Sequence, residues 1–367
     1  MILPGPLHDV EQRLNGRLYG LSKYYEGSVI STGWRQEKCK IGSFDVSVLC
    51  RFTGRKIKTG LLLLRHCIKV ARHRKKHKNG YQFIVTYDPL KTGLFGLLLR
   101  AMYGGMLIVE INGDYAEIEN YDEHRFKLVR YLKRYIYMKI ESFVVKRADG
   151  IKLLYPDQIA WLNYDKSKKT VHTYFNYSGL ERFCNIKDNN EVLFVGSPYY
   201  LKGVDLLIAA FKTLSHKHPL WRLKIVGWFL NVDEVLADID MHPNIEYCKA
   251  VQSNEITKII GSCSFLVLPS RTEAMGRVLL EAMACGKPRI GSNVGGIPTV
   301  IEHGVDGFLF EKNNVTELIK YMDLLISDKD LREQMGCRAK DRVGVEFTLD
   351  NYVVKTKKFY SDVMFLK

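Results

Sequence analysis

The stretch from Ser264 to Phe310 constrains the fold of this 367-residue chain more than any other. It begins with a short apolar run that Pro269 closes, as expected for a buried strand of a parallel sheet. Apolar residues then recur at helical spacing from about Gly276 to Cys285. This order predicts a strand, a loop and a helix.

The rest of the stretch repeats this pattern. Gly286 stands where a left-handed helix cap is wanted, and Arg289–Ser292 begins a second strand. A Gly-Gly loop, a helix from about Pro298 and a strand at Gly307–Phe310 follow. The resulting βαβαβ order is the unit of a nucleotide-binding parallel sheet, in which ligands lie beyond the carboxyl ends of the strands.

The loop Ser270–Met275 is therefore predicted to line a ligand site. It ends at the amino end of a helix, whose free N–H groups and partial positive charge suit a phosphate. Two acids flank this helix start, Glu273 in the loop and Glu281 within the helix. Either acid could contact the ligand. Alternatively, Glu273 only complements the helix dipole and Glu281 is a solvated surface acid, and spacing alone does not decide between these readings.

The residues from Glu273 to Pro288, E-A-M-G-R-V-L-L-E-A-M-A-C-G-K-P, resemble a known signature. It is the E-x7-E motif of retaining GT-B glycosyltransferases, in particular family 4, the glycosyl transferases group 1. The usual form is E-x-F-G-x-x-x-x-E-A-M-A-x-G-x-P, and only its Phe differs here, as Met275. The later sequences V-G-G-I-P and G-V-D-G-F-L-F extend the resemblance.

The resemblance implies that Glu273 is catalytic and hydrogen-bonds hydroxyls of the donor sugar, and that Glu281 holds the ribose hydroxyls. Backbone amides at the start of the helix would meet the sugar and its diphosphate. The donor-binding residues implied here are Glu273, Ala274, Met275, Gly276, Arg277, Val278 and Glu281.

A second part of the donor site is implied upstream, between a predicted strand at Glu191–Gly196 and a predicted helix at Val204–Leu214. The intervening loop resembles the Lys-Gly turn of the family, in which the lysine, here Lys202, pairs with the donor diphosphate and counts as catalytic. An ordinary surface lysine is the alternative. The arginine that commonly precedes it by five positions is replaced by Ser197.

Further glycine and backbone positions complete the implied donor site. Gly196 ends the predicted strand, and the backbone at Ala250 and Val251 follows the predicted strand Asn244–Cys248, where the family contacts the nucleobase. Gly5 stands near the place of a glycine-bearing loop of the family, and Gly16 is a further candidate.

The first half of the chain predicts a second parallel α/β domain. Its predicted strands are Met1–Leu3, Phe44–Leu49, Phe83–Thr86, Met106–Ile111 and Ile151–Leu154. Because 163–190 is polar and rich in turn residues, we place the boundary near Ile186. Together with the resemblance, this implies an α/β fold of the GT-B type, with two doubly wound Rossmann-like domains facing a central cleft. Residues 1–185 would bind the acceptor and 186–347 the donor, with a terminal helix at 348–367 packing back on the first domain.

Asn112 stands where family members often carry a histidine that approaches the donor sugar, so the resemblance gives Asn112 a catalytic position. An amide hydrogen-bonds a hydroxyl but takes up no proton. Asp114 is a candidate substitute, and a turn-forming aspartate is the alternative.

The formal net charge of +15 is confined to the first half. Residues 1–190 hold 33 Lys and Arg against 18 Asp and Glu, a difference of +15, whereas 191–367 hold 22 of each. From Val46 to Tyr87 there are 11 basic residues and no acid. This window fits a solvated basic surface, a helix attracted to anionic lipid, or a nucleic-acid surface.

We favour an anionic membrane and expect no nucleic acid as partner. The predicted membrane-facing residues are Arg72, Arg74, Lys75, Lys76 and Lys78. A second basic helical stretch at Arg125–Lys152 is aromatic, and aromatic residues at this spacing predict core positions. These are Tyr131, Tyr135, Tyr137 and Phe143.

Several other classes of protein are disfavoured. No apolar run long enough to span a membrane and no signal peptide is present. The eight cysteines form no C-x-x-C pair, and neither G-x-G-x-x-G nor a Walker A sequence occurs. The D-x-D at Asp238–Asp240 lies in an acidic helical stretch, so we interpret it as structural and expect neither a metal nor another cofactor.

The resemblance implies transfer of a sugar from a nucleotide diphosphate sugar to a lipid-linked or polysaccharide acceptor, with retention at the anomeric carbon. The partners expected are a nucleotide sugar, a lipid-linked or glycan acceptor and an anionic membrane. The predicted setting is cell-surface glycan biosynthesis, in the cytoplasm at the inner face of the membrane. The alternatives are another GT-B enzyme, such as a nucleotide-sugar epimerase or a phosphorylase, and a non-enzymatic basic binding module.

Overall fold

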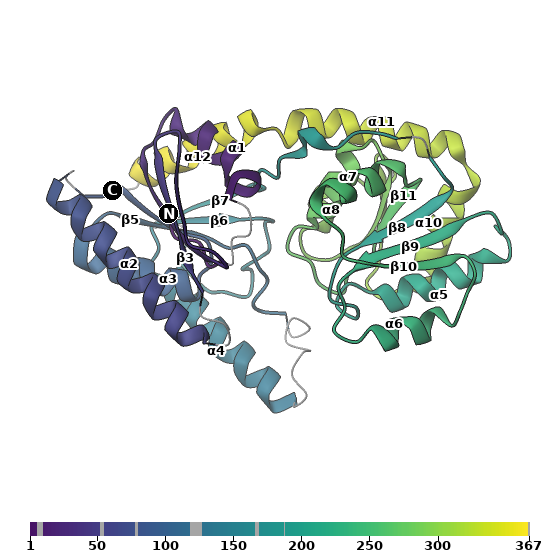
Figure 1. The fold of residues 1–367 in the computed structure, drawn as a ribbon, viewed down its shortest axis with the longest axis horizontal. Coiled ribbons are helices and arrows are strands. Elements are labelled where there is room, and N and C mark those ends of the chain that lie inside the picture. Colours follow the sequence, from purple (N-terminus) through teal and green to yellow (C-terminus); the bar gives the residue numbers. More distant parts are fainter. Residues whose placement is uncertain are drawn as a thin grey trace. The chain divides into compact units, whose positions relative to one another are not determined.

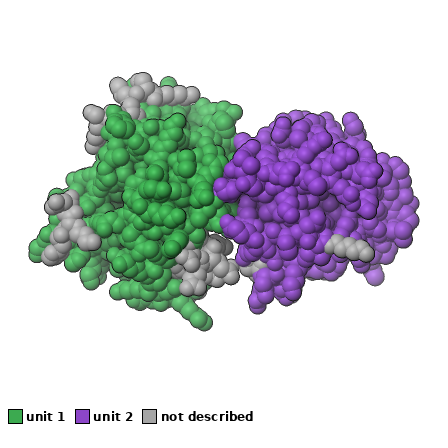
Figure 2. Space-filling view, turned by 90° about the horizontal axis from the view of Figure 1, so that it is seen from above, with its two compact units in different colours: residues 1–179, 349–367 green, residues 180–348 purple. Residues whose placement is uncertain are grey.

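The computed structural model describes residues 1–5, 10–51, 55–77, 80–117, 127–165, 169–186 and 188–365. The chain forms two compact units, one of Met1–Gly179 with Leu349–Lys367 and one of Leu180–Thr348 (Figure 2). The second unit begins earlier than the predicted boundary at Ile186. The short 3-10 turn Leu180–Arg182 packs against the second unit, and the Ile186 N–H donates to the Gly261 carbonyl at 2.8 Å.

The second unit is built on a sheet of six parallel strands (Figure 1). Its order is β10-β9-β8-β11-β12-β13. The chain therefore moves outward in one direction from β8 and then in the other direction from β11, which is a doubly wound fold with its switch point between β8 and β11. The sequence predicted all six strands, including a strand at Leu223–Val226 that corresponds to β9. They are β8 (Glu191–Val195), β9 (Arg222–Gly227), β10 (Ile245–Lys249), β11 (Phe265–Leu268), β12 (Arg289–Ser292) and β13 (Gly307–Phe310).

Helices cover this sheet in two groups, with α10 against α5 and α11 against α8. Strands β11 and β12 are buried along their whole length, as expected for a sheet covered on both faces. The helices are α5 (Val204–Ser215), α6 (Val232–Ile239), α7 (Ser253–Ser262), α8 (Arg277–Ala284), α9 (Ile297–Val300), α10 (Val315–Ser327) and α11 (Lys329–Glu346).

The sheet of the first unit consists of two parts that meet at Ile2. One part has the order β1-β3-β2 and the other β4-β5-β6-β7. Ile2 bridges to Ile30 of the first part and to Thr86 of the second, so the predicted strand at Met1–Leu3 is present only as this bridge. The strands are β1 (Gly27–Gly33), β2 (Glu37–Ile41), β3 (Phe44–Cys50), β4 (Phe83–Thr86), β5 (Met106–Glu110), β6 (Gly150–Leu153) and β7 (Thr170–Thr173).

In the described part of this unit, five helices lie on or beside this sheet. They are α1 (Val10–Ser22), α2 (Lys56–His77), α3 (Lys91–Tyr103), α4 (Lys127–Val145) and α12 (Leu349–Phe365). The last helix packs against α1, β6 and β7, where Phe359 and Tyr360 join the aromatic core with Tyr174 and Phe83. In the part of the chain that the structure describes, no helix is both long and apolar enough to cross a membrane.

Candidate functional site

Two side chains far apart in sequence meet at the switch point of the second sheet. Lys202 comes from the loop between β8 and α5, and Glu273 from the loop between β11 and α8. The Lys202 Nζ donates to the Glu273 Oε2 at 2.5 Å. The two side chains keep 17% and 14% of their surface exposed, so solvent and small molecules reach the pair. The structure thus brings together two of the three residues that were predicted to be catalytic.

Close backbone packing holds these two loops against each other. Gly203 begins α5 with a φ of +68°, and a Cβ there would lie 2.0 Å from the Pro269 carbonyl oxygen. The Arg271 N–H donates to the Leu201 carbonyl at 2.9 Å. Only glycine allows this approach with a left-handed backbone, which explains the Lys-Gly sequence physically.

Arg271 fastens the same loops through its side chain, and the sequence analysis missed this residue. Its guanidinium forms two hydrogen bonds to the carboxylate of Asp205, at 2.8 and 2.7 Å, and lies 3.8 Å from the centre of the Tyr200 ring. Bidentate pairs of this kind fix geometry as well as adding energy. Tyr200 lies in the loop before α5 and Asp205 in the first turn of α5, so no local sequence pattern around Arg271 could have found these partners.

The V-G-G-I-P loop packs against the backbone of Glu273 and Ala274. A Cβ on Gly295 would lie 1.9 Å from the Glu273 carbonyl oxygen, and a Cβ on Gly296 would lie 2.2 Å from that of Ala274. The Gly296 N–H donates to the Glu273 carbonyl at 3.0 Å. The two glycines therefore let one loop press directly on the backbone that carries Glu273.

Helix α8 begins at this point and contains the second acid. Gly276 caps it with a φ of +68°, and the Met275 N–H lies 3.4 Å from the Glu273 Oε1. Glu281 is only 7% exposed, so the interpretation as a solvated surface acid is wrong. Burial raises the pKa of Glu281, and the positive charges of Arg277 and Arg182 partly offset this effect. The Arg277 Nε lies 3.2 Å from the Glu281 Oε1.

A family comparison agrees with this geometry, because residues 181–342 match the family described as glycosyl transferases group 1. This match covers the second unit and less than half of the chain. The chain is 37% identical over 214 residues to an N-acetyl-alpha-D-glucosaminyl L-malate synthase of Bacillus anthracis, across 54% of this chain and 55% of that protein. The chain therefore spans about half the length of this relative.

Solved structures of glycosyltransferases share the fold over nearly the whole chain. A sucrose-phosphate synthase from Thermosynechococcus elongatus superposes with a TM-score of 0.78 at 14% identity, covering 100% of this chain and 99% of that one. The protein HepE from Anabaena, in complex with UDP-glucose, gives 0.70 at 16% identity and covers 97% and 99%. The predicted GT-B fold of this glycosyltransferase is thereby confirmed.

The other predicted donor residues of this glycosyltransferase lie along the same edge of its second sheet. The Gly196 N–H donates to the Val226 carbonyl at 3.0 Å, and the exposed Ser197 donates through its Oγ to the Trp228 carbonyl at 2.5 Å. Val251 is 36% exposed and follows β10, two strands away from β8.

The predicted residues of the first unit are fixed by contacts of their own. Gly5 has a φ of +63°, and a Cβ there would lie 2.3 Å from the Thr32 Oγ1. At the further candidate, Gly16, a Cβ would lie 2.7 Å from the Tyr177 ring. Both glycines therefore allow close packing within the first unit.

Asn112 begins a buried polar network. Its Nδ2 donates to the Tyr87 carbonyl at 2.9 Å, and its Oδ1 accepts from the Asn176 Nδ2 at 2.7 Å. The Asn176 Oδ1 accepts in turn from Lys152, whose Nζ lies 3.5 Å from the Glu110 Oε2. Burial lowers the pKa of Lys152 to about 8. Asp114 accepts from the Tyr155 hydroxyl at 2.5 Å.

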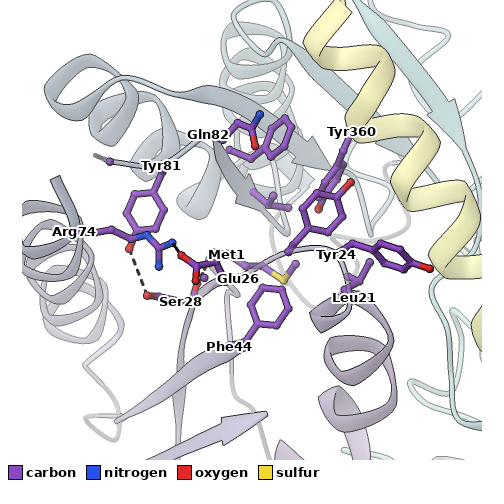
Figure 3. Close-up of a pocket in the computed structure, with 15 residues that line it drawn as sticks. Met1, Leu21, Tyr24, Glu26, Ser28, Phe44, Arg74, Tyr81, Gln82 and Tyr360 are labelled. Atoms are coloured by element: carbon purple, nitrogen blue, oxygen red, sulfur yellow. Dashed lines mark hydrogen bonds and ion pairs between the residues drawn. The ribbon is translucent and has the colours of Figure 1, made fainter. Parts of the chain in front are cut away.

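The predicted membrane-facing residues do not all face solvent. Arg72, Lys75 and Lys76 on α2 are exposed, whereas Lys78 lies outside the described residues. The prediction for Arg74 is wrong, because its guanidinium pairs with the Glu26 carboxylate and lies 5.2 Å from the centre of the Tyr81 ring (Figure 3). It lines a cavity of about 420 Å³ together with aromatic side chains. A carboxylate and an aromatic face stabilise the cation better than the helix surface does.

The D-x-D sequence is held in structural contacts. Asp238 accepts a hydrogen bond from the Tyr199 hydroxyl, and Asp240 ends α6 with a φ of 52°. Among the described residues no group of three or more His, Cys, Asp or Glu side chains is arranged to hold a metal ion.

Proposed function

We propose that this group 1 glycosyltransferase moves a hexosyl unit from a nucleotide diphosphate sugar to a lipid-linked or polysaccharide acceptor, with retention of the anomeric configuration. The observation that carries the proposal is the exposed Lys202–Glu273 pair beside the amino end of α8, at the switch point of the second sheet. An ammonium group next to a helix amino end suits a diphosphate, and the adjacent carboxylate suits sugar hydroxyls.

Each of these groups then has a definite role. As the bond between the anomeric carbon and the diphosphate oxygen breaks, negative charge grows on the leaving diphosphate, and Lys202 and the first amides of α8 stabilise it. Glu273 accepts hydrogen bonds from the donor-sugar hydroxyls, and the buried Glu281 accepts from the ribose. The leaving diphosphate takes the proton of the acceptor hydroxyl, so no protein nucleophile is required.

We also propose that the reaction needs no divalent metal. Lys202 and the amino end of α8 would supply the positive charge that a metal ion otherwise provides to the diphosphate. Activity should persist in excess chelator. Loss of activity that manganese or magnesium restores would contradict this part of the proposal.

A panel of nucleotides and nucleotide sugars tests the donor. Since a ligand that binds only the folded state raises stability by RT ln(1 + [L]/Kd), nucleoside diphosphates and their sugars should raise the Tm well above the value with free nucleosides. Because the HepE structure contains UDP-glucose, UDP and its sugars are the first nucleotides to try. If no nucleotide stabilises the protein, the donor assignment fails.

The buried guanidinium of Arg17 in the first unit favours an anionic acceptor, such as the phosphate of a lipid carrier. Arg17 is 4% exposed, and within the described part of the chain its Nε has no hydrogen-bond partner. Its guanidinium lies 4.5 Å from the centre of the Tyr87 ring, just beyond the carboxyl end of β4. The Arg17 Nη2 donates only to the weakly accepting Met1 Sδ, at 3.8 Å. Burying a cation is costly, and an acceptor phosphate that accepts from the Nε would offset part of that cost. Arg17→Gln should raise KM for a phosphorylated acceptor and leave KM for the donor unchanged.

The charge of the first unit supports peripheral docking at the inner, anionic face of a membrane, in the cytoplasm, as part of cell-surface glycan synthesis. On α2 the exposed Arg72, Lys75 and Lys76 provide the cations, each worth ~1 kcal/mol near such a surface. Replacing these three by Gln should reduce sedimentation with anionic vesicles at low salt. Equal binding to neutral vesicles, or no binding to anionic ones, would favour a polyanionic soluble acceptor instead.

Another GT-B enzyme, an epimerase or a phosphorylase, is the second candidate, because such enzymes could use the same donor edge. Product analysis separates the candidates. A transferase yields a glycosylated acceptor and needs the acceptor for turnover, whereas an epimerase converts the nucleotide sugar without any acceptor.

A further inference from the structure

Helix α4 carries a stripe of large apolar side chains that face solvent. The sequence predicted core positions for its aromatic residues, and for Tyr131, Tyr135 and Phe143 this prediction is wrong. The stripe repeats at intervals of three, four and seven residues, which places it on one helix face. Its members and their exposed fractions are Leu128 79%, Tyr131 59%, Leu132 56%, Tyr135 59%, Ile136 44% and Phe143 46%.

The buried residues of the helix lie near its carboxyl end, and Arg134 in its middle donates a hydrogen bond to the Ala116 carbonyl. Of its 19 residues, all of which the structure describes, the buried ones are Glu141, Val144 and Val145. There α4 packs closely on α3, since a Cβ on Gly93 would lie 2.8 Å from the Val144 Cγ1. Figure 1 shows the amino-terminal end of α4 projecting away from the sheet of the first unit. The exposed stripe therefore lies on the part of the helix that the core does not use.

The net charge of α4 indicates which kind of partner could cover this stripe. Five cations against Glu141 give α4 a net charge of +4, and they are Lys127, Arg130, Lys133, Arg134 and Lys139. Two of these lysines lie near tyrosine rings of the same helix, Lys133 at 5.7 Å from Tyr137 and Lys139 at 5.2 Å from Tyr135. A second copy of this helix would bring like charges together, whereas an anionic lipid surface complements them.

We infer that α4 is an interfacial helix that inserts the Leu128–Phe143 stripe into an anionic membrane. Leu128, Leu132 and Ile136 enter the boundary of the acyl chains, the tyrosines lie at headgroup level, and the cations meet lipid phosphates. The inference rests on the proposed membrane partner and adds an element to it. Docking through α2 is electrostatic and salt-sensitive, whereas α4 supplies a hydrophobic contact that salt does not remove.

Sedimentation with vesicles of phosphatidylglycerol and phosphatidylcholine, at about 0.1 M and about 1 M NaCl, tests the inference. The unmodified protein should keep a bound fraction at high salt. The double variant Leu128→Ser, Leu132→Ser should lower the partition coefficient roughly 100-fold, since each inserted leucine contributes about a factor of ten or more. The matched control is Leu220→Ser, Leu230→Ser on the second unit, where the side chains are 81% and 76% exposed, and it should bind normally.

Three results would overturn the inference. The α4 variant could bind as well as the unmodified protein, or all binding could vanish at high salt, which would leave α2 alone as the docking element. The protein could also be a dimer in solution that the α4 variant dissociates, which would make the stripe a contact between copies. Donor hydrolysis by the α4 variant should equal that of the unmodified protein, and a failure of donor hydrolysis in both would count against the proposed glycosyl transfer rather than against α4.

Discussion

Each unit holds a lysine–glutamate pair near the carboxyl edge of its sheet, and the two pairs differ in how deeply they are buried. In the second unit Lys202 and Glu273 are 2.5 Å apart and partly exposed. In the first unit Lys152 and Glu110 are 3.5 Å apart and each 1% exposed. A ligand can replace one member of a solvent-accessible ion pair at little cost in free energy. Breaking a buried pair destabilises the fold, because the remaining charge is left uncompensated.

The same contrast appears in the backbone. Gly203, Gly295 and Gly296 let the loops of the second unit touch each other's carbonyl groups, so the position of Glu273 is set by main-chain packing. At the edge of the first unit, Asn112 is positioned by side-chain hydrogen bonds to Tyr87 and Asn176. Main-chain packing leaves a glycine signature in the sequence. A side-chain network leaves none, because its members are scattered along the chain.

Replacing the two lysines separately should give the largest effects and test this comparison directly. Lys202→Ala should reduce kcat/KM about 100-fold or more with little change in Tm, since a transition-state charge contact is lost. Lys152→Ala should lower the free energy of unfolding by about 3–5 kcal/mol, because Glu110 stays buried without its cation. Steady-state kinetics and thermal unfolding of both variants are the measurements. The distinction between the units would collapse if Lys202→Ala destabilised the protein as strongly as Lys152→Ala.

Each unit also contains a buried glutamate, and the two are expected to affect stability differently as pH changes. Burial raises the pKa of Glu141 in the first unit to about 8, with a further contribution from Asp114, whereas Arg277 and Arg182 offset burial at Glu281 in the second. A carboxyl whose folded pKa lies above its unfolded value of ~4.5 stabilises the fold at low pH and loses this contribution as pH rises through 8. Glu141→Gln should therefore gain stability over the unmodified protein, by up to a few kcal/mol, between pH 5 and 8.

Thermal unfolding at several pH values measures this gain. Glu281→Gln serves as the matched variant and should show a smaller pH-dependent gain, since its arginine neighbours favour the ionised form. A gain for Glu141→Gln that does not change with pH would mean that the acid is already ionised at low cost.

Much of the second unit could be predicted because its signals are local. All six strands were placed within about one residue, since each is a short apolar run closed by a turn residue, and the E-x7-E stretch named Glu273 and Glu281. Arg271 could not be found in this way. Its role depends on Asp205 and Tyr200, which the fold alone brings to it.

The first unit was harder to predict for physical reasons. Strand β1 is rich in Gly and Ser, β2 is a charged edge strand, and β7 reads Thr-Val-His-Thr in a polar region, so none shows a strong apolar run. The aromatic spacing of α4 indicated a stripe on one helix face, but the prediction that this stripe is buried in the core is wrong. Periodicity shows that such a face exists and does not show what covers it. Arg74 was predicted to be exposed because sequence does not reveal that Glu26 and Tyr81 lie beside it.

Alanine at two left-handed glycines should separate backbone strain from main-chain contact in the second unit. Gly304 has a φ of +76° and open space at its Cβ, whereas Gly295 has a φ of +51° and faces the Glu273 carbonyl. Gly304→Ala should cost ~1 kcal/mol of stability. Gly295→Ala should cost about 2–3 kcal/mol and also reduce turnover, since the Glu273 loop must move. Equal losses of stability with unchanged turnover would show that Gly295 does not position Glu273.

Removing one charge at the exposed pair should have a more moderate effect. Glu273→Gln keeps the shape and one hydrogen-bond acceptor, so nucleotide affinity should hold while kcat falls roughly tenfold, the scale of a charged hydrogen bond worth ~1.5 kcal/mol. Isothermal titration with a nucleoside diphosphate and turnover under donor saturation measure the two quantities. Unchanged turnover would remove Glu273 from the catalytic residues and leave it as a dipole partner of α8.

The smallest expected effect concerns the one position where the donor edge departs from the usual arginine. Ser197 is exposed and follows β8, in the same loop as Lys202. A cation at such a solvated site contributes only ~0.5–1 kcal/mol, so Ser197→Arg should tighten binding of a nucleoside diphosphate about two- to fivefold and leave binding of the free nucleoside unchanged.

Ser197→Gln is the control, because both variants lose the hydrogen bond to the Trp228 carbonyl but only one adds charge. The gain should shrink as salt is added, since the site is exposed. If the two variants bind the diphosphate equally, the donor phosphates lie out of reach of this loop, and Lys202 with the amino end of α8 would carry that contact alone.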